Sequence, residues 1–175
     1  MDDQIQHRLA EFFGSSRPSR WVTRERPKID RIACPWLIRR FIDPQAEILF
    51  VPTPEVFATA EREGAVAFDL PGAPFSHDDE LCSFDAFIKQ FSLVDTGLAI
   101  LAPIVRGADT DRHDLAPEAA GLHAFSLGLS ITHSNDQAML AQGLIFYDAL
   151  YAWARTGQDE RHAWRPNEVQ GEQLK

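Results

Sequence analysis

The 175-residue chain has few cysteines and no long apolar stretch. Its two cysteines, Cys34 and Cys82, are too few for a disulfide framework or for a four-cysteine zinc site. No apolar run approaches the roughly 18 residues that a membrane-spanning helix needs. The N-terminal segment MDDQIQHRLAEFF is acidic and amphipathic, whereas a secretory signal begins with basic residues and continues with apolar ones. These absences predict a cytoplasmic protein that has reduced thiols and does not associate with a membrane.

Positive charge is scarce overall and concentrated in one segment. The formal net charge is −9, which argues against a nucleic-acid partner. Eight of the 17 basic residues nevertheless lie between positions 17 and 40, next to only two acidic residues. Such a cationic segment on an acidic chain suits a small inorganic anion, an acidic protein partner or internal ion pairs.

Common catalytic signatures are absent as well. The chain contains no Gly-rich phosphate loop, no G-x-S-x-G elbow, no H-E-x-x-H helix and no dinucleotide-binding fingerprint. These absences remove the most direct functional assignments, although they do not exclude an enzyme of another type.

Apolar residues make up 45% of the chain, and their pattern predicts a helix-rich α/β fold. Short apolar segments at 21–22, 46–52 and 65–70 are typical of buried strands. Between them, one helix is expected to begin near Cys34–Pro35 and another at Pro54. Strands that alternate with helices of this length indicate a small, mostly parallel sheet of about three strands, joined by crossover helices.

The residues after Gly72 predict a helical half. Helices are expected over 3–13, over 84–92 with Ser83 as the cap, over 98–105, from Asp114 or Ala116 onward, and after a capping box at Ser134-x-x-Gln137. The last helix is apolar almost all round and is therefore predicted to be buried and central. We divide the chain into an N-terminal extension (1–19), a single domain (20–156) and a polar C-terminal tail (157–175).

Three loops, 28–36, 76–83 and 106–112, hold most of the residues that could carry chemistry. Because ligands bind beyond the carboxyl ends of parallel strands, the loops after the first and third strands are expected to share a site. A mixed set of nitrogen and oxygen ligands from these loops would suit a divalent ion of zinc, manganese or iron. The predicted metal ligands are His77, Glu80, Asp109, Asp30 and Asp111. Alternatively, these side chains cap turns and helices or pair with arginines.

Arginines near the same loops are candidates for binding an oxyanion, because the guanidinium group offers forked hydrogen bonds. The predicted anion-binding residues are Arg31, Arg39, Arg106 and Arg112. The alternative is that they pair with the surplus carboxylates of the chain.

Cys34 is expected at a helix N-terminus beside Arg31, and both features would favour a thiolate. This makes Cys34 a candidate reactive thiol, whereas the acidic residues 78–80 disfavour a thiolate at Cys82. A small buried apolar residue is the alternative for both. Asp148, among apolar residues, is expected to pair with an arginine. His123 is expected to be an ordinary surface or core histidine.

Four long segments resemble the C-terminal domain of the bacterial chromate resistance protein family: PKIDRIACPWLIRRFID, SHDDELCSFDAF, IVRGADTDRHDLAPEAAGL and FYDALYAWAR. The resemblance runs from about Arg20 to Arg155. It implies a role in resistance to chromate, commonly alongside a chromate efflux transporter, and in regulatory members a role in sensing chromate. Longer members carry an additional N-terminal domain credited with DNA binding. This chain has only residues 1–19 there, so DNA binding is not expected.

The residues and the resemblance together suggest a cytoplasmic domain for the stress response to chromate. It would bind an oxyanion such as chromate, a divalent metal ion, or both. The alternative is a metal-dependent enzyme, a hydrolase or a reductase, in which His77, Glu80 and Asp109 bind the metal and a metal-bound water is the nucleophile. A third reading is an interaction module whose cationic segment binds an acidic protein partner.

Overall fold

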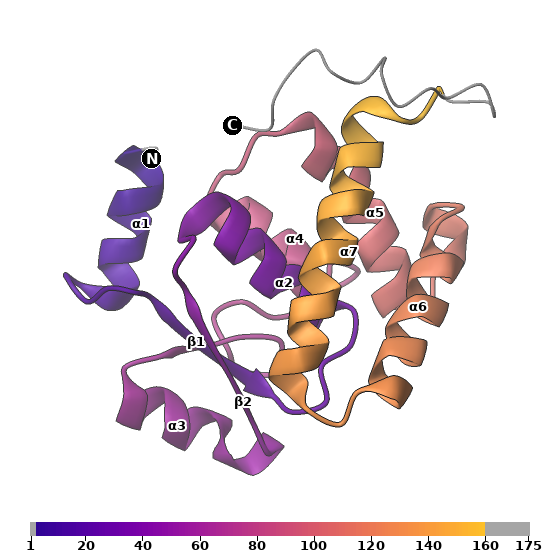
Figure 1. The fold of residues 1–175 in the computed structure, drawn as a ribbon. Helices are drawn as coiled ribbons and strands as arrows, with labels where there is room; N and C mark the ends of the chain where they lie inside the picture. The colour runs from indigo at the N-terminus through magenta and orange to yellow at the C-terminus, as the bar shows by residue number, and fades with distance from the viewer. Residues whose placement is uncertain (1–2, 160–175) are drawn as a thin grey trace.

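The computed structural model describes residues 3–159, so most of the predicted polar tail lies outside the described residues. The order of its elements can be followed in Figure 1. They are α1 (Asp3–Phe13), β1 (Arg20–Arg24), α2 (Asp30–Leu37), η1 (Ile38–Ile42), β2 (Glu47–Val51), η2 (Thr53–Glu55), α3 (Val56–Glu63), β3 (Val66–Ala67), α4 (Ser83–Gln90), α5 (Thr96–Asp109), η3 (His113–Leu115), α6 (Ala119–Thr132) and α7 (Asp136–Thr156).

The three strands form one parallel sheet in the order β2-β1-β3. This confirms the predicted helix-rich α/β fold with a small parallel sheet. Strand β3 is shorter than predicted, since it pairs with β1 only through Val66 and Ala67. The chain then turns away at Asp69, whose φ is 57°, and Phe68 forms an isolated bridge with Phe75.

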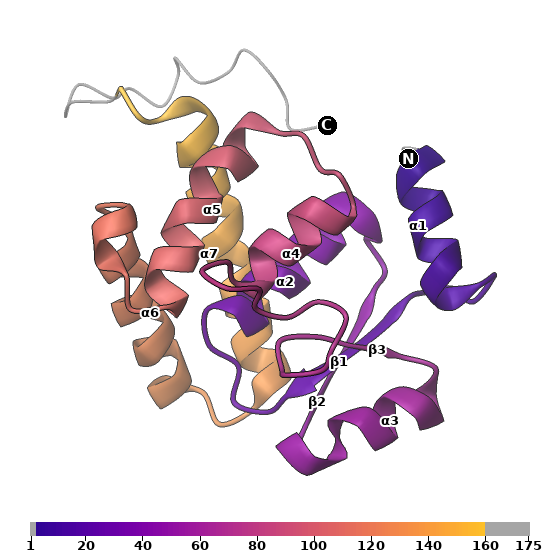
Figure 2. The same ribbon diagram turned by 180° about the vertical axis from the view of Figure 1, so that it is seen from behind.

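The two faces of the sheet are covered unequally. Along β1, Val22 packs with Val56 and Ala67 in the small apolar cluster between the sheet and α3. Its neighbour Trp21 points to the opposite face and joins the main core, which the other helices build. Figures 1 and 2 show α3 on one side of the sheet, whereas α2, α4, α5, α6 and α7 lie on the other side. Strand β1 is therefore buried on both faces, as is usual for the middle strand of a parallel sheet.

Helix α2 begins one turn earlier than predicted, at Asp30 rather than near Cys34–Pro35. The first turn closes when the N–H of Ala33 donates to the carbonyl of Ile29 at 2.8 Å. Pro35 then sits inside the helix, where it removes a single hydrogen bond. The helix continues as a π-helical turn, η1, in which the N–H of Asp43 reaches the carbonyl of Ile38. The earlier start places Asp30, not Cys34, at the N-terminus.

Two predicted helix caps are also displaced by one residue. The cap of α4 is Cys82 rather than Ser83, because Asp85 accepts a hydrogen bond from the Cys82 backbone. The cap of α7 is Asn135 rather than Ser134, since its side chain accepts from the N–H of Ala138. The third helix of this half, α6, begins at Ala119 and not at Asp114 or Ala116 as predicted, because His113–Leu115 form the separate turn η3 and Ala116 after it is extended.

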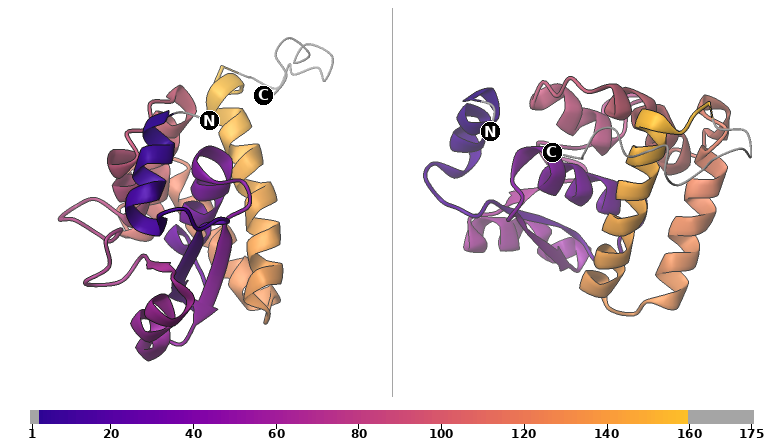
Figure 3. Two further views of the ribbon diagram at one scale, coloured as in Figure 1. Left: turned by 90° about the vertical axis from the view of Figure 1, so that its left-hand side faces the viewer. Right: turned by 45° about the horizontal axis from the view of Figure 1, so that its top comes forward.

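Helices α6 and α7 run side by side at one end of the molecule, as Figure 3 shows. The prediction that the last helix is buried holds for only one face of α7, because Ile145 is 65% exposed. The buried positions of α7 form one face, which packs on α2 and α5. None of the helices in the described part of the chain is long and apolar enough to cross a membrane.

Helix α1 packs against the domain and is not separated from it. Its residues Ile5, Leu9 and Phe13 belong to the main core, and the ring of Phe13 lies 5.2 Å from that of Trp21. Arg8 donates a hydrogen bond to Gln90 of α4. Helix α1 thus covers the end of the core beside α4.

Candidate functional site

The site lies at the edge of the sheet where the segments that follow β1 and β3 lead away from each other. Strand β1 is central; the chain leaves it toward β2 on one side, and β3 is placed on the other side. The loops that follow β1 and β3 therefore separate beyond the carboxyl ends of the strands and leave a crevice, where parallel sheets bind ligands. Asp30 follows β1 and Asp69 follows β3, so both carboxylates reach this crevice.

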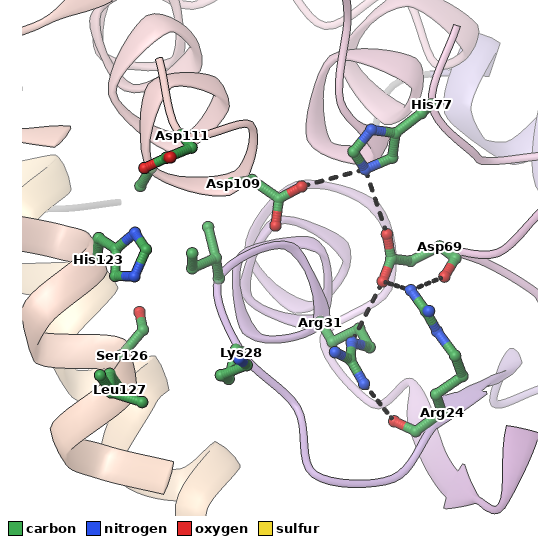
Figure 4. A pocket seen from close by; sticks show the side chains of 12 residues that line it. Arg24, Lys28, Arg31, Asp69, His77, Asp109, Asp111, His123, Ser126 and Leu127 are labelled. Atoms are coloured by element: carbon green, nitrogen blue, oxygen red, sulfur yellow. Dashed lines mark hydrogen bonds and ion pairs between the residues drawn. The ribbon is translucent and has the colours of Figure 1, made fainter. Parts of the chain in front are cut away.

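Three carboxylates surround one nitrogen atom of His77. Nε2 of His77 lies 3.1 Å from Oδ2 of Asp109, 3.6 Å from Oδ1 of Asp69 and 3.7 Å from Oδ2 of Asp30. Figure 4 shows the imidazole pointing between Asp109 and Asp69. The four residues come from α2, from the segment after β3, from the following loop and from the end of α5, so the site depends on the whole fold.

Asp30 is the deepest of these groups, at 1% exposure. Its Oδ2 accepts a hydrogen bond of 2.6 Å from the backbone N–H of Ser83, while its Oδ1 is buried without a hydrogen-bond partner among the described residues. Burial raises the pKa of Asp30 well above its usual value, and the charges of Asp109 and Asp69 raise it further. A buried carboxylate oxygen without a partner is costly and calls for a specific explanation.

The imidazole of His77 is the cation that these carboxylates hold. Hydrogen bonds to Asp109 and then Asp69 raise the pKa of His77 to about 10, against the effect of its partial burial. The side chain is nonetheless 42% exposed, so its far edge reaches solvent. His77 therefore joins the buried carboxylates to the open side of the site.

Asp69 is oriented by two arginines. Its Oδ2 lies 2.9 Å from a terminal nitrogen of Arg24 and 3.2 Å from Nε of Arg31, and its Oδ1 accepts from the hydroxyl of Ser83 and faces His77. Burial by itself raises the pKa of Asp69, but the hydrogen bond from His77 and the charge of Arg24 outweigh it, and the pKa lies below its usual value. Asp69 is thus held as a carboxylate with one oxygen directed into the site.

A pocket of about 340 Å³ opens beside this cluster. Arg24, Arg31, Asp69, His77 and Asp109 line one wall. The opposite wall comes from the loop after α5 and from α6, with Lys28 below (Figure 4). Its polar residues are Asp111, His123 and Ser126. The volume suits a small ligand rather than a macromolecule.

The structure brings three of the five predicted metal ligands together, namely Asp30, His77 and Asp109. Asp111 lines the pocket on the opposite wall. Glu80 is exposed and is not among the lining residues, because the tight turn closed by Asp78 and Leu81 carries it away from His77. Asp69 was not among the predicted ligands. It lies at the end of the third apolar segment, and the position of Asp30 after the first apolar segment is the same kind of signal.

Of the four predicted anion-binding arginines, the structure places only Arg31 in the pocket. Arg106 forms two hydrogen bonds of 2.9 Å with Asp85, and Arg112 pairs with the exposed Asp114. Arg39 donates to the carbonyl of Ala46. Arg106 and Arg112 thus show the pairing with carboxylates that was the alternative, whereas Arg39 binds a backbone carbonyl.

The prediction of a thiolate at Cys34 is wrong. Cys34 is fully buried in the second turn of α2, and burial raises the pKa of its thiol well above the usual value, with a further contribution from the charge of Asp30. The helix N-terminus and Arg31 therefore do not activate it. The prediction that Asp148 pairs with an arginine is also wrong. Asp148 is exposed and accepts a hydrogen bond from Nε1 of Trp36.

The fold and the site define a small α/β domain with a histidine and carboxylate cluster at the point where its strand order reverses. The family described as ChrB, C-terminal domain, matches residues 21–154. The chain is 36% identical over 132 residues to Protein ChrB of Cupriavidus metallidurans, an alignment that covers 75% of this chain and 39% of the relative. This chain belongs to the ChrB family, the chromate-resistance family that the sequence motifs indicated. It spans about two fifths of the length of that relative, and no solved structure matches it.

Proposed function

We propose that this domain serves chromate resistance by binding a divalent metal ion through Asp30, Asp69 and His77, with Asp109 beside them. Each of the first three residues offers one ligand atom, and these atoms lie within 4.8 Å of one another. The observation that carries the proposal is Oδ1 of Asp30, a buried oxygen without a partner among residues 3–159. A cation in the cluster would stabilise the ionised form of this buried carboxyl group, which burial otherwise disfavours.

The charges of the cluster also support a cation. His77 bears a proton at neutral pH because carboxylates surround it. A metal ion that replaces this proton brings a second positive charge to the same carboxylates, and metal ligation requires the imidazole in its neutral form. Arg24 and Arg31 balance Asp69 but do not reach Asp30 or Asp109 by any ion pair between described residues.

The ligand types favour manganese, iron or zinc over magnesium and calcium. Carboxylate oxygens suit all of these ions, but an imidazole ligand is typical of transition metals and zinc. A soft ion such as Cu(I) is not expected, because both cysteines are buried and have a raised pKa.

Metal binding to the purified 175-residue chain tests the proposal. Mn²⁺ should bind with about one equivalent to the unmodified protein, and His77→Ala or Asp109→Asn should weaken it by about tenfold or more. Asp78→Asn is the matched control, because Asp78 neighbours His77 but its side chain is 71% exposed and lies outside the cluster. Equal Mn²⁺ affinity in all four proteins would overturn the proposal.

Chromate is a second candidate ligand for the same pocket. The observation that favours it is the basic side of the pocket, where Lys28 joins Arg24 and Arg31. Both arginines are paired with Asp69, and three carboxylates lie nearby, so a dianion would meet little net positive charge in the metal-free pocket. Chromate should therefore bind more tightly to the metal-loaded protein, and Lys28→Ala should weaken that binding, whereas Arg20→Ala should not. Calorimetry with chromate and sulfate measures both effects.

A further inference from the structure

A second group of potential ligands lies on the opposite wall of the pocket. Asp111 follows α5, His113 opens the short turn η3, and His123 lies in α6. One ligand atom from each of the three residues lies within 4.8 Å of the other two. This group shares no residue with the cluster around His77, so the two groups can be tested by separate substitutions.

The two histidines are arranged as a pair of metal ligands would be. Nε2 of His113 lies 3.3 Å from Nδ1 of His123, and the two rings are perpendicular, with their centroids 5.3 Å apart. Two imidazole nitrogens that bind one tetrahedral zinc ion at about 2.0–2.1 Å must lie about 3.3–3.4 Å from each other. The observed separation of the two nitrogens meets this requirement.

Asp111 supplies an oxygen next to the same nitrogen. Its Oδ1 lies 3.7 Å from Nε2 of His113, and its side chain is 86% exposed and therefore free to turn toward an ion. His113 is 38% exposed on the same scale, so a hydrated ion has direct access. The set of two imidazoles and one carboxylate leaves at least one coordination position open.

We propose that Asp111, His113 and His123 form a second metal site, which takes a borderline divalent ion of the Zn²⁺, Co²⁺ or Fe²⁺ class. Two imidazoles favour these ions over Mg²⁺ and Ca²⁺, which prefer oxygen ligands. Asp111 and His123 line the pocket, so the open coordination position faces the same cavity as His77. A small anion in the cavity would then have a cation on this wall even when the His77 cluster is empty.

The alternative is a hydrogen bond between the two imidazoles, which gives the same distance. Zinc titration of the 175-residue chain against a chromophoric chelator separates the two. His113→Gln and His123→Gln should each remove one equivalent of bound Zn²⁺, or lower its affinity by about 100-fold. His7→Gln is the control, because His7 is 81% exposed on α1 and distant from the pocket. Unchanged thermal unfolding of the metal-free variants confirms that the fold is intact.

The same titration distinguishes this proposal from the proposed function. His77→Ala should leave the equivalent that depends on His113 and His123, and Co²⁺ bound to it should show the visible absorption of tetrahedral cobalt. If His123→Gln binds as many equivalents as the unmodified protein with the same affinity, the second site does not exist. The loss of an equivalent in His77→Ala alone would support only the first site.

Discussion

The backbone N–H of Ser83 donates a hydrogen bond of 2.6 Å to Oδ2 of Asp30, and this contact joins the N-terminus of α4 to the N-terminus of α2. The hydroxyl of Ser83 donates to Asp69 at 3.0 Å. One serine thus positions two of the carboxylates that face His77, from segments 53 and 14 residues away in the sequence. Ser83 therefore holds the carboxylates of Asp30 and Asp69 in fixed positions relative to each other.

Asp30→Asn should make the metal-free protein more stable, by about 0.5–2 kcal/mol at neutral pH. The amide keeps the shape of the side chain and one oxygen that can accept from Ser83. It removes a carboxyl group whose ionised form is disfavoured by burial. The same change should abolish the increase in melting temperature that Mn²⁺ gives to the unmodified protein. Thermal unfolding with and without Mn²⁺ measures both effects. A metal-free Asp30→Asn protein that is less stable than Asp78→Asn would contradict this account.

Gly143→Ala should destabilise the fold by about 1–3 kcal/mol, because a methyl group there would overlap Cγ2 of Ile32 where α7 crosses α2. Gly128→Ala is the matched control in α6, where an added methyl group meets no atom within 4 Å. That change should stabilise the protein by about 0.5–1 kcal/mol through helix propensity. Urea unfolding of both variants tests the contrast, and similar effects in both would show that α7 and α2 are not closely packed.

Asp43→Asn should destabilise the protein by about 1–3 kcal/mol at pH 7. Burial raises the pKa of Asp43, but its hydrogen bonds from the side chain and backbone of Ser19 and from the backbone of Gln45 outweigh this and place the pKa below its usual value. A carboxyl group with a lowered pKa stabilises the fold fully above its unfolded pKa of about 3.9, and this contribution is lost as the pH falls through the folded value.

The stability difference between Asp43→Asn and the unmodified protein should therefore be constant from pH 7 to about pH 5 and shrink below about pH 4. Urea unfolding at a series of pH values measures it. A difference that grows as the pH falls would mean that Asp43 is not held as a carboxylate by Ser19.

Both cysteines should resist alkylation in the native protein. Cys34 and Cys82 are fully buried, so the reagent cannot reach either sulfur. Burial also raises the pKa of each thiol, which disfavours the reactive thiolate. Iodoacetamide at pH 8 should label both only in denaturant, at rates that mass spectrometry can compare. Rapid labelling of Cys34 in the folded protein would restore its candidacy as a reactive thiol.

The strands and most of the helices were predictable because their signals are local. The apolar segment 46–52 and the proline at position 54 lie within a few residues of the elements that they define, and the structure has β2 and α3 there. The start of α2 differs from the prediction, because Pro35 is typical of a first helical turn but lies one turn further inside this helix. The cap of α7 was missed for a similar reason, since Ser134 and the adjacent Asn135 are both good caps.

The candidate site was predictable only in outline. The order of elements alone predicts that Asp30 and His77 lie together, because parallel strands end at the same edge of a sheet. No local pattern shows that Arg106 donates to Asp85 or that Asp148 accepts from Trp36. Each contact joins two different helices, and their packing is not visible in the residues next to either partner.

The amino-acid sequence by itself determined the class of fold, the sheet edge that holds the site and the family to which the chain belongs, since these depend on local periodicity and on long motifs. The tertiary structure alone decided that Asp69 and Asp109 reach His77, that Cys34 is buried, and that His113 meets His123. The physical reason is that side-chain burial and charge partners are set by how β1, α2 and α5 pack together, and local patterns along the chain do not reveal contacts between residues that are distant in the sequence.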